Sequence, residues 1–175
     1  EEIDQQLEQD KYYRWLTFAV VPMHYISLFG TLWYTVTVPL SWWAFLLLAL
    51  NAGLISGLAI NTGHELGHKN TKIEKLLARL ALSVPAYGHF SIDHNRGHHM
   101  QVATPEDHAS SRMGESIYQF ALREIPGALL SAWKIEGNRL KNRNIRVWSF
   151  SNQILQSYAI TITFSTLLII LFGWK

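Results

Sequence analysis

The chain has 175 residues, a length that ordinarily indicates one soluble domain, but its charged residues are distributed very unevenly. None of its 15 basic and 13 acidic residues lies in 15–64, a run of 50 residues, or in 147–174, a run of 28. A soluble surface that included such tracts would expose large apolar patches, so the sequence excludes a water-soluble monomer. The absence of cysteine also excludes a disulfide scaffold, a Cys-ligated metal and a thiol nucleophile, which leaves eight histidines as the main metal-binding residues.

The first charge-free tract is long enough for two membrane-spanning helices, because one crossing needs about 20 apolar residues. We predict spans over 15–36 and 40–60, joined by a turn at 37–39. Trp and Tyr residues fall near the expected ends of both spans, where amphipathic rings favour the lipid headgroup region. Pro22 is expected to bend the first helix. The tract therefore predicts a transmembrane hairpin.

A third span is predicted over 154–174, and the polar region 65–146 lies between it and the hairpin. This region has 12 Lys and Arg against 8 Asp and Glu, so the positive-inside rule places it, together with residues 1–14, in the cytoplasm. The predicted fold class is all-α: a polytopic transmembrane helical bundle with a histidine-rich metal site on its cytoplasmic side. With no repeat and no low-complexity linker, residues 1–175 are expected to form a single membrane-embedded domain.

Within the polar region, two features predict helices. Thr104, followed by Pro105 and two acidic residues, has the composition of a helix start. An amphipathic helix is expected over 117–135, interrupted at Pro126–Gly127. The mostly apolar stretch 73–90 is compatible either with an interfacial helix or with a shallow pair of helices.

Five of the eight histidines fall in two short clusters. His64 and His68 are four residues apart and share one face of a helix that continues the second span. His94 and His98 repeat this spacing, and His99 is expected about 100° around the same helix. Neutral imidazole binds iron, zinc and copper, and five imidazoles exceed the three protein ligands of a typical catalytic zinc site. The clusters predict a centre of more than one metal ion, with no catalytic residues beyond the ligands.

Polar neighbours of these histidines are expected to fix the orientation of the imidazoles. The candidates are Glu65, Asp93 and Asn95. Gly97, inside the second cluster, leaves room for close approach of a metal or of another backbone.

The first cluster also has an interpretation in a different class of protein. His64-Glu65-x-x-His68 matches the H-E-x-x-H motif of zinc metalloproteases, in which Glu65 would be the general base of a membrane protease. No later motif supplies a third ligand of the kind such proteases use, and the second cluster would be surplus. A non-catalytic membrane protein is the third possibility.

The residues that flank the two clusters resemble bacterial alkane 1-monooxygenase, an integral-membrane, non-haem di-iron hydroxylase of medium-chain alkanes. The resemblance rests on 61–63 before the first cluster and on 102–107 and 110–116 after the second. It extends over essentially the whole chain and includes 21–25, 123–128 and 147–150. Related membrane fatty-acid desaturases and hydroxylases share histidine clusters of similar spacing. A function of that kind is the alternative to alkane hydroxylation.

This resemblance implies a complete set of functional assignments. The iron ligands would be His64, His68, His94, His98 and His99, which would hold two non-haem iron ions. The enzyme would insert one oxygen atom of O₂ into the terminal methyl of an alkane drawn from the bilayer and release a 1-alkanol. Rubredoxin and its NAD(P)H-dependent reductase would supply electrons in the bacterial inner membrane. The protein is also expected to contact membrane lipid, and it is not expected to bind nucleic acid.

Apolar residues of the second span are candidates for the wall of the substrate channel. They are Leu54, Ile55, Leu58 and Ile60, although packing against lipid or neighbouring helices is an equally good interpretation.

Two residues depart from the resembled pattern, and part of the pattern is absent. Asp93 stands where Glu is usual, and His108 stands where Pro is usual. The remaining histidine motifs of the family would follow residue 175, so we expect the chain to be an N-terminal to central part of the enzyme and inactive alone.

Three histidines outside the two clusters have separate expectations. His24 is expected to hydrogen-bond a neighbouring helix within the membrane. His89 is expected to be structural or to support a ligand, and His108 to lie at the surface or cap a helix.

Overall fold

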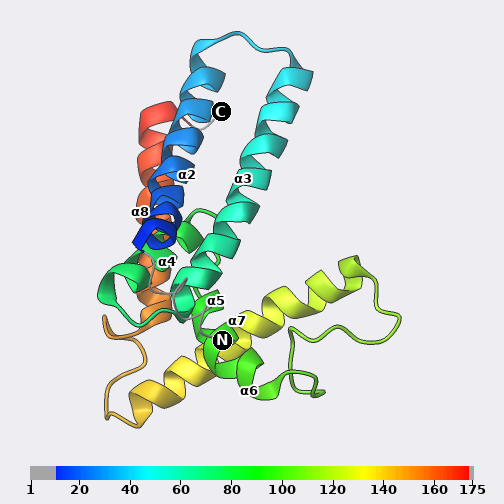
Figure 1. The fold of residues 1–175 in the computed structure, drawn as a ribbon, viewed down its shortest axis with the longest axis vertical. Helices are drawn as coiled ribbons and strands as arrows, with labels where there is room; N and C mark the ends of the chain where they lie inside the picture. The colour runs from blue at the N-terminus through cyan, green and yellow to red at the C-terminus, as the bar shows by residue number, and fades with distance from the viewer. Residues whose placement is uncertain (1–10, 174–175) are drawn as a thin grey trace. The chain divides into compact units, whose positions relative to one another are not determined.

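The computed structural model describes residues 11–173, and these residues contain helices and connecting segments but no strand. In chain order the helices are α2 (Lys11–Thr37), α3 (Trp42–His68), α4 (Lys72–Ser83), α5 (Phe90–Asp93), the π-helix η1 (His94–His98), α6 (His99–Gln101), α7 (Ile117–Lys141) and α8 (Gln153–Phe172) (Figure 1). The all-α prediction is therefore confirmed. Most of the predicted cytoplasmic segment 1–14, and the end of the third predicted span at Trp174, lie outside the described residues.

Three helices are long and apolar enough to cross a membrane, and they coincide with the three predicted spans. They are α2, α3 and α8. The second begins at Trp42 rather than at Leu40, because Ser41 is its N-cap and accepts a hydrogen bond from the Ala44 amide. It continues without a break to His68, as the sequence predicts. Pro22 lies inside α2 without ending it.

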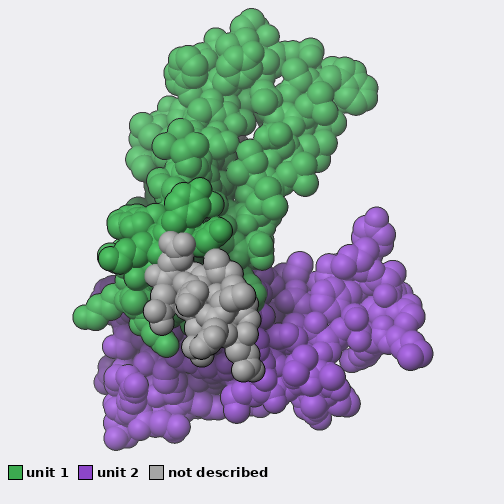
Figure 2. All heavy atoms as spheres, viewed as in Figure 1, with its two compact units in different colours: residues 1–85, 163–175 green, residues 86–162 purple. Residues whose placement is uncertain are grey.

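The chain packs as two compact units, which are coloured separately in Figure 2. Unit 1 comprises residues 1–85 and 163–175, and unit 2 comprises residues 86–162. Each unit has its own small core. That the whole chain forms one domain stays a prediction.

In unit 1, α2 and α3 form a helical hairpin, and α4 packs against both (Figure 1). The core of the unit is apolar and small: Val21, Leu66, Ala78 and Ala81. The close approach of α3 and α4 depends on Gly63, because a Cβ at this position would lie 2.7 Å from Cγ of the fully buried Leu82. Gly63 directly precedes His64, so this contact holds the histidine-bearing end of α3 against α4.

The start of α4 is fixed by a charged side chain that is almost wholly buried. Glu74 forms a capping box with Thr71 and an ion pair with Arg14 of α2, whose Nε lies 3.0 Å from Oε1. Burial of Glu74 opposes its ionisation, but the hydrogen bonds from Thr71 and the charges of Arg14 and Lys69 outweigh this and keep its pKa below the ordinary value. The ion pair links the first turns of α2 and α4.

In unit 2, α5 and η1 pack on α7 around a core that includes Ile92, Ala132 and Ile154. Glu136 of α7 is completely buried and accepts two hydrogen bonds of 2.6 Å from Arg139. It also accepts the backbone N–H of Gln153 at 2.7 Å, which attaches the first turn of α8 to α7. Burial raises the pKa of Glu136, but Arg139 and the Gln153 amide more than offset burial and lower it overall.

The helix predicted over 117–135 is present as α7, but its predicted interruption and the helix start predicted at Thr104 are wrong. α7 is not interrupted at Pro126–Gly127, because the residues after the proline, Gly127, Ala128 and Ala132, are small and buried, so packing sustains the helix. No helix begins at Thr104, where the chain makes turns instead. The reason is that the Asp107 side chain bonds to the Ala109 amide and to Ser110, an alternative to helical hydrogen bonding.

Replacement of Gly63 by alanine is expected to destabilise unit 1. The added methyl meets a buried side chain that has no free space, so overpacking should cost about 1–3 kcal/mol. Gly57→Ala in the same helix is the matched control, because no atom lies within 4 Å of its Cβ position and the helix propensity of alanine should favour it. Thermal unfolding midpoints in one detergent compare the two variants. Equal midpoints for both would contradict the proposed contact.

Candidate metal centre

The histidine pair of unit 1 lies in the last turn of α3. The Nε2 atoms of His64 and His68 are 3.0 Å apart, and their rings are nearly perpendicular. The helix places both rings on one face because the residues are four apart. Glu65, between them in sequence, extends to Lys69 instead, with a distance of 3.1 Å between Oε1 and Nζ, and it is more than half exposed.

The second cluster lies on a π-helix rather than on the α-helix that the sequence predicts. The His99 backbone N–H donates to the His94 carbonyl, a spacing of five residues that widens the turn. As a result, His94 and His99 face each other, with their Nε2 atoms 3.0 Å apart. The expectation that His99 lies about 100° around an α-helix is therefore corrected: the turn is a π-helix, in which His99 faces His94. The His98 ring stacks on that of His94, with ring centroids 5.3 Å apart.

The π-helix is packed closely against α7 through Gly97. A Cβ at this position would lie 2.6 Å from Oδ1 of Asp93 and 3.2 Å from Oγ of Ser131. The room at Gly97 is thus taken by these side chains. Asp93 is buried and hydrogen-bonds Ser131. Burial raises its pKa, and the neighbouring groups only partly counteract this.

The carboxylate that orients a candidate ligand is Asp107. Its Oδ2 lies 2.9 Å from Nδ1 of His98, and the side chain is buried. Burial opposes its ionisation, but hydrogen bonds from Ser110, the Ala109 amide and His98 outweigh burial and lower its pKa. A carboxylate bound at Nδ1 holds the proton there and leaves the Nε2 lone pair of His98 available to a metal.

Asp107 is not among the residues that the sequence predicts for the site. The expectation of a helix start at 104–107 assigns its carboxylate to a helix N-terminus instead. The nearest sequence signal is the spacing of nine residues between His98 and Asp107, which carries no information without the fold of the loop. Asn95, which the sequence does propose as an orienting residue, donates its side-chain N–H to the Ser91 carbonyl.

The histidines outside the two clusters have other surroundings. His24 is buried in unit 1, with Nε2 3.2 Å from Oγ of Ser56 on α3, which confirms its predicted interhelical hydrogen bond. His89 is buried in unit 2, with Nδ1 3.3 Å from the Tyr158 hydroxyl, and burial lowers its pKa. His108 is exposed, as predicted, and its ring lies against Gly127.

The donor sets fit a transition metal that prefers nitrogen ligands. Two nitrogens bound about 2.1 Å from one ion, at nearly a right angle, lie about 3.0 Å apart. Both imidazole pairs have this separation between Nε2 atoms. Imidazole suits iron, zinc and copper, whereas a calcium or magnesium site would need oxygen ligands. Each unit thus offers a pair of imidazoles in an arrangement compatible with metal binding.

Comparison with known proteins gives a family and several relatives. A sequence model of the family described as "Fatty acid desaturase" matches residues 40–175, most of the chain. The chain is 52% identical over 175 residues to alkane 1-monooxygenase of Ectopseudomonas oleovorans, covering 100% of this chain and 44% of that protein. It is 50% identical over 173 residues to alkane 1-monooxygenase 1 of Alcanivorax borkumensis, covering 99% and 43%.

A more distant similarity links the chain to an enzyme of another name. It is 28% identical over 112 residues to the xylene/toluene monooxygenase hydroxylase component of Pseudomonas putida, covering 63% of this chain and 30% of that protein. The chain spans less than half the length of the curated relatives it matches.

The role of Asp107 is testable by metal binding. Asp107→Asn removes the charge that orients His98 and should weaken binding of Fe²⁺ or Co²⁺ by about 10–100-fold, the usual effect of losing such a carboxylate. Glu106→Gln makes the same chemical change at an exposed neighbour and should leave affinity unchanged. Competition with a chelator of known affinity measures both variants. Equal affinities would remove Asp107 from the site.

Proposed function

Because the chain belongs to the fatty acid desaturase family, we propose that it is part of a membrane di-iron monooxygenase that hydroxylates alkanes at the terminal methyl. The observation that carries this proposal is the paired geometry of the histidine boxes, in which two Nε2–Nε2 distances of 3.0 Å recur in separate helices. The names of the two alkane 1-monooxygenases described above support the reaction type.

The five histidines of the two clusters are proposed as iron ligands. They are His64, His68, His94, His98 and His99. When bound, two non-haem iron ions would supply the activation of O₂ and the oxidation of a C–H bond. The residues of this chain hold the imidazoles in position: α3 aligns the first pair, the π-helix aligns His94 with His99, and Asp107 keeps the His98 proton on Nδ1. The two boxes are proposed to serve one centre, because neither has enough imidazoles for two ions.

The proposed substrate is a medium-chain alkane taken from the bilayer. An alkane has no polar group to recognise, so a membrane enzyme must collect it by apolar contact and orient it by shape. Three apolar helices make this chain a membrane protein. Leu54, Ile55, Leu58 and Ile60 of α3 are proposed to contact the substrate on its way to the His64–His68 end of that helix. The exposed side chains of Leu54 and Leu58 are compatible with this and equally with contact to lipid.

The electrons are proposed to come from NAD(P)H through a reductase and rubredoxin, which would dock from the cytoplasm. The basis is the resemblance to the alkane monooxygenases together with the excess of basic residues in 65–146. The proposed location is the bacterial inner membrane, with the metal centre on its cytoplasmic side.

Substitutions in the first box test the proposed chemistry. In the protein with its natural flanking sequence, His64→Ala should abolish alkane hydroxylation and reduce bound iron, because it removes one of the proposed ligands. His108→Ala removes an exposed imidazole outside the boxes and should retain both properties. Octane oxidation with rubredoxin and reductase, and iron per chain, are the measurements. Full activity in His64→Ala would exclude the ligand assignment.

The neighbouring glutamate separates an oxygenase from a metalloprotease. Glu65→Gln would eliminate a protease whose general base is Glu65. In a di-iron oxygenase it should leave iron content and hydroxylation within a few-fold of the unchanged protein, since Glu65 pairs with Lys69. The measurements are octane oxidation, iron per chain and cleavage of a peptide substrate. Peptide cleavage by the unchanged protein that is lost in Glu65→Gln with the metal retained would favour the protease.

The proposed topology is testable with reporter fusions. A reporter that is active only in the periplasm should give a signal after Val38, between α2 and α3, and none after Ala103. A reporter that is active only in the cytoplasm should give the reverse result. Equal signals at the two sites would contradict the transmembrane hairpin.

A further inference from the structure

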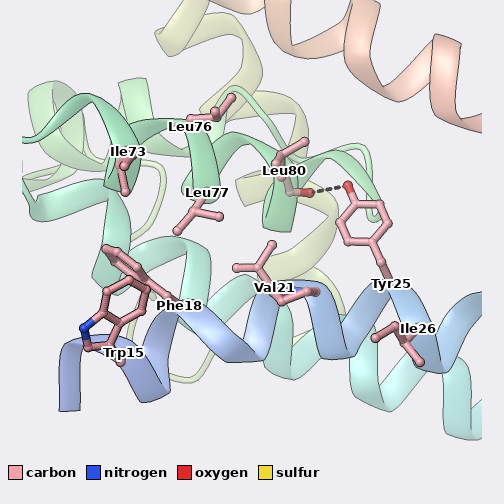
Figure 3. A pocket seen from close by; sticks show the side chains of 10 residues that line it. Trp15, Phe18, Val21, Tyr25, Ile26, Ile73, Leu76, Leu77 and Leu80 are labelled. Carbon is pink, nitrogen blue, oxygen red and sulfur yellow. Dashed lines mark hydrogen bonds between the residues drawn. The ribbon is translucent and has the colours of Figure 1, made fainter. Parts of the chain in front are cut away.

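An open apolar groove of about 690 Å³ lies between α2 and α4 in unit 1 (Figure 3). Its volume is within the range of cavities that bind small organic ligands. Phe18 and Val21 of α2 and Leu77 of α4 lie between the two helices, as Figure 3 shows. The lining includes Trp15, Phe18, Val21 and Ile26 of α2 and Leu76 and Leu80 of α4.

The groove offers almost no hydrogen-bonding group to an occupant. Its one hydroxyl, that of Tyr25, donates to the Leu80 carbonyl at 2.9 Å and lies 2.9 Å from Oγ of Ser83 (Figure 3, dashed line). The other lining side chains are hydrocarbon, apart from the indole N–H of Trp15. A suitable occupant is therefore a hydrocarbon chain.

The length of the groove matches the depth of one lipid leaflet. It follows α2 from Trp15 to Ile26, which at 1.5 Å per residue is about 16 Å, close to half of the roughly 30 Å hydrocarbon core of a bilayer. Arg14 precedes Trp15, and a tryptophan beside a charged residue is typical of the headgroup region. The groove thus extends from the membrane surface inward, as an acyl chain does.

Positive charge lies beside the surface end of this groove. Lys72 and Lys75 are in the first turn of α4. At about 100° per residue, Lys72 lies about 40° around the helix from Leu76 and about 80° from Leu80, and Lys75 lies about 100° and about 140° from them. Both lysines are exposed, and neither forms an ion pair with any residue in 11–173. The nearby acidic residue, Glu74, is already paired with Arg14. The charge of the two lysines therefore complements an anionic headgroup.

We propose that the groove binds one anionic phospholipid, with an acyl chain between α2 and α4 and the phosphate at Lys72 and Lys75. The bound lipid would stabilise the packing of α4 on α2. α4 in turn contacts Gly63 through Leu82, next to His64. The lipid thereby supports the end of α3 that carries the first histidine pair.

The test uses a single fluorescent label, which the absence of cysteine makes possible. The chain, with its natural flanking sequence, carries Leu76→Cys in the groove or Leu54→Cys on α3, both at exposed positions. Each labelled protein is placed in phosphatidylcholine vesicles that contain a small fraction of bromine-chain phosphatidylglycerol or bromine-chain phosphatidylcholine. Bromine quenches only a label that its acyl chain contacts.

The proposal predicts a difference between the two positions. The Leu76 label should be half-quenched at about 25-fold less phosphatidylglycerol than phosphatidylcholine, since each of the two lysines near an anionic headgroup is worth roughly a fivefold preference. The Leu54 label should respond equally to both lipids. Lys72→Gln with Lys75→Gln should reduce the Leu76 preference to less than about twofold, with an unchanged thermal unfolding midpoint.

A matched double variant controls for net charge. Lys141→Gln with Arg143→Gln removes two exposed charges of unit 2 and should leave the Leu76 preference intact. Equal quenching of the Leu76 label by the two lipids in the unsubstituted chain would overturn the proposal. So would a preference that survives in the Lys72 and Lys75 variant, or one that is lost equally in both double variants.

Discussion

A polar group inside the hydrocarbon of a membrane has to find its hydrogen-bond partner within the protein, and this constraint organises the whole chain. Hydroxyl groups in the spanning helices satisfy it locally by donating to carbonyls of the preceding turn. Examples are Thr31 to Ser27, Ser56 to Ala52 and Ser157 to Gln153. His24, too large for such a bond, instead reaches the neighbouring helix at Ser56. Groups that need water or a metal lie beyond the apolar stretches, as the pair at the end of α3 does.

Rigidity at the candidate centre comes from buried charge as well as from apolar packing. In unit 2, Glu136 joins α7 to the first turn of α8 through Arg139 and the Gln153 amide. Asp107 joins the loop after α6 to the π-helix through His98. Removing one partner of a buried pair typically costs about 3–5 kcal/mol, so these networks resist local distortion. The His98 imidazole is thus oriented before any metal binds.

The sequence predicts those features that depend on composition over many residues. The absence of charge in 15–64 defines the hairpin, and the spacing of four residues identifies the pair His64 and His68. Features that depend on tertiary contacts cannot be predicted from the sequence in this way. The turn around Asp107 replaces a predicted helix because that carboxylate bonds to the Ala109 amide and to Ser110, and in the fold it also reaches a histidine from another segment. The helix continues past Pro126 because small residues after it are packed on the buried side.

The π-helix makes the second histidine cluster sensitive to chain length as well as to composition. In an α-helix each residue is rotated by about 100° around the axis. His99, five residues after His94, would then point away from it. Loss of one residue between them would bring the two to the four-residue spacing of the first cluster, but it would also shift the position of Gly97, where the π-helix approaches α7 closely. Insertions and deletions in this segment are therefore expected to disrupt the pairing of His94 with His99 more than substitutions of its exposed side chains do. The register of the helix is therefore part of the metal site.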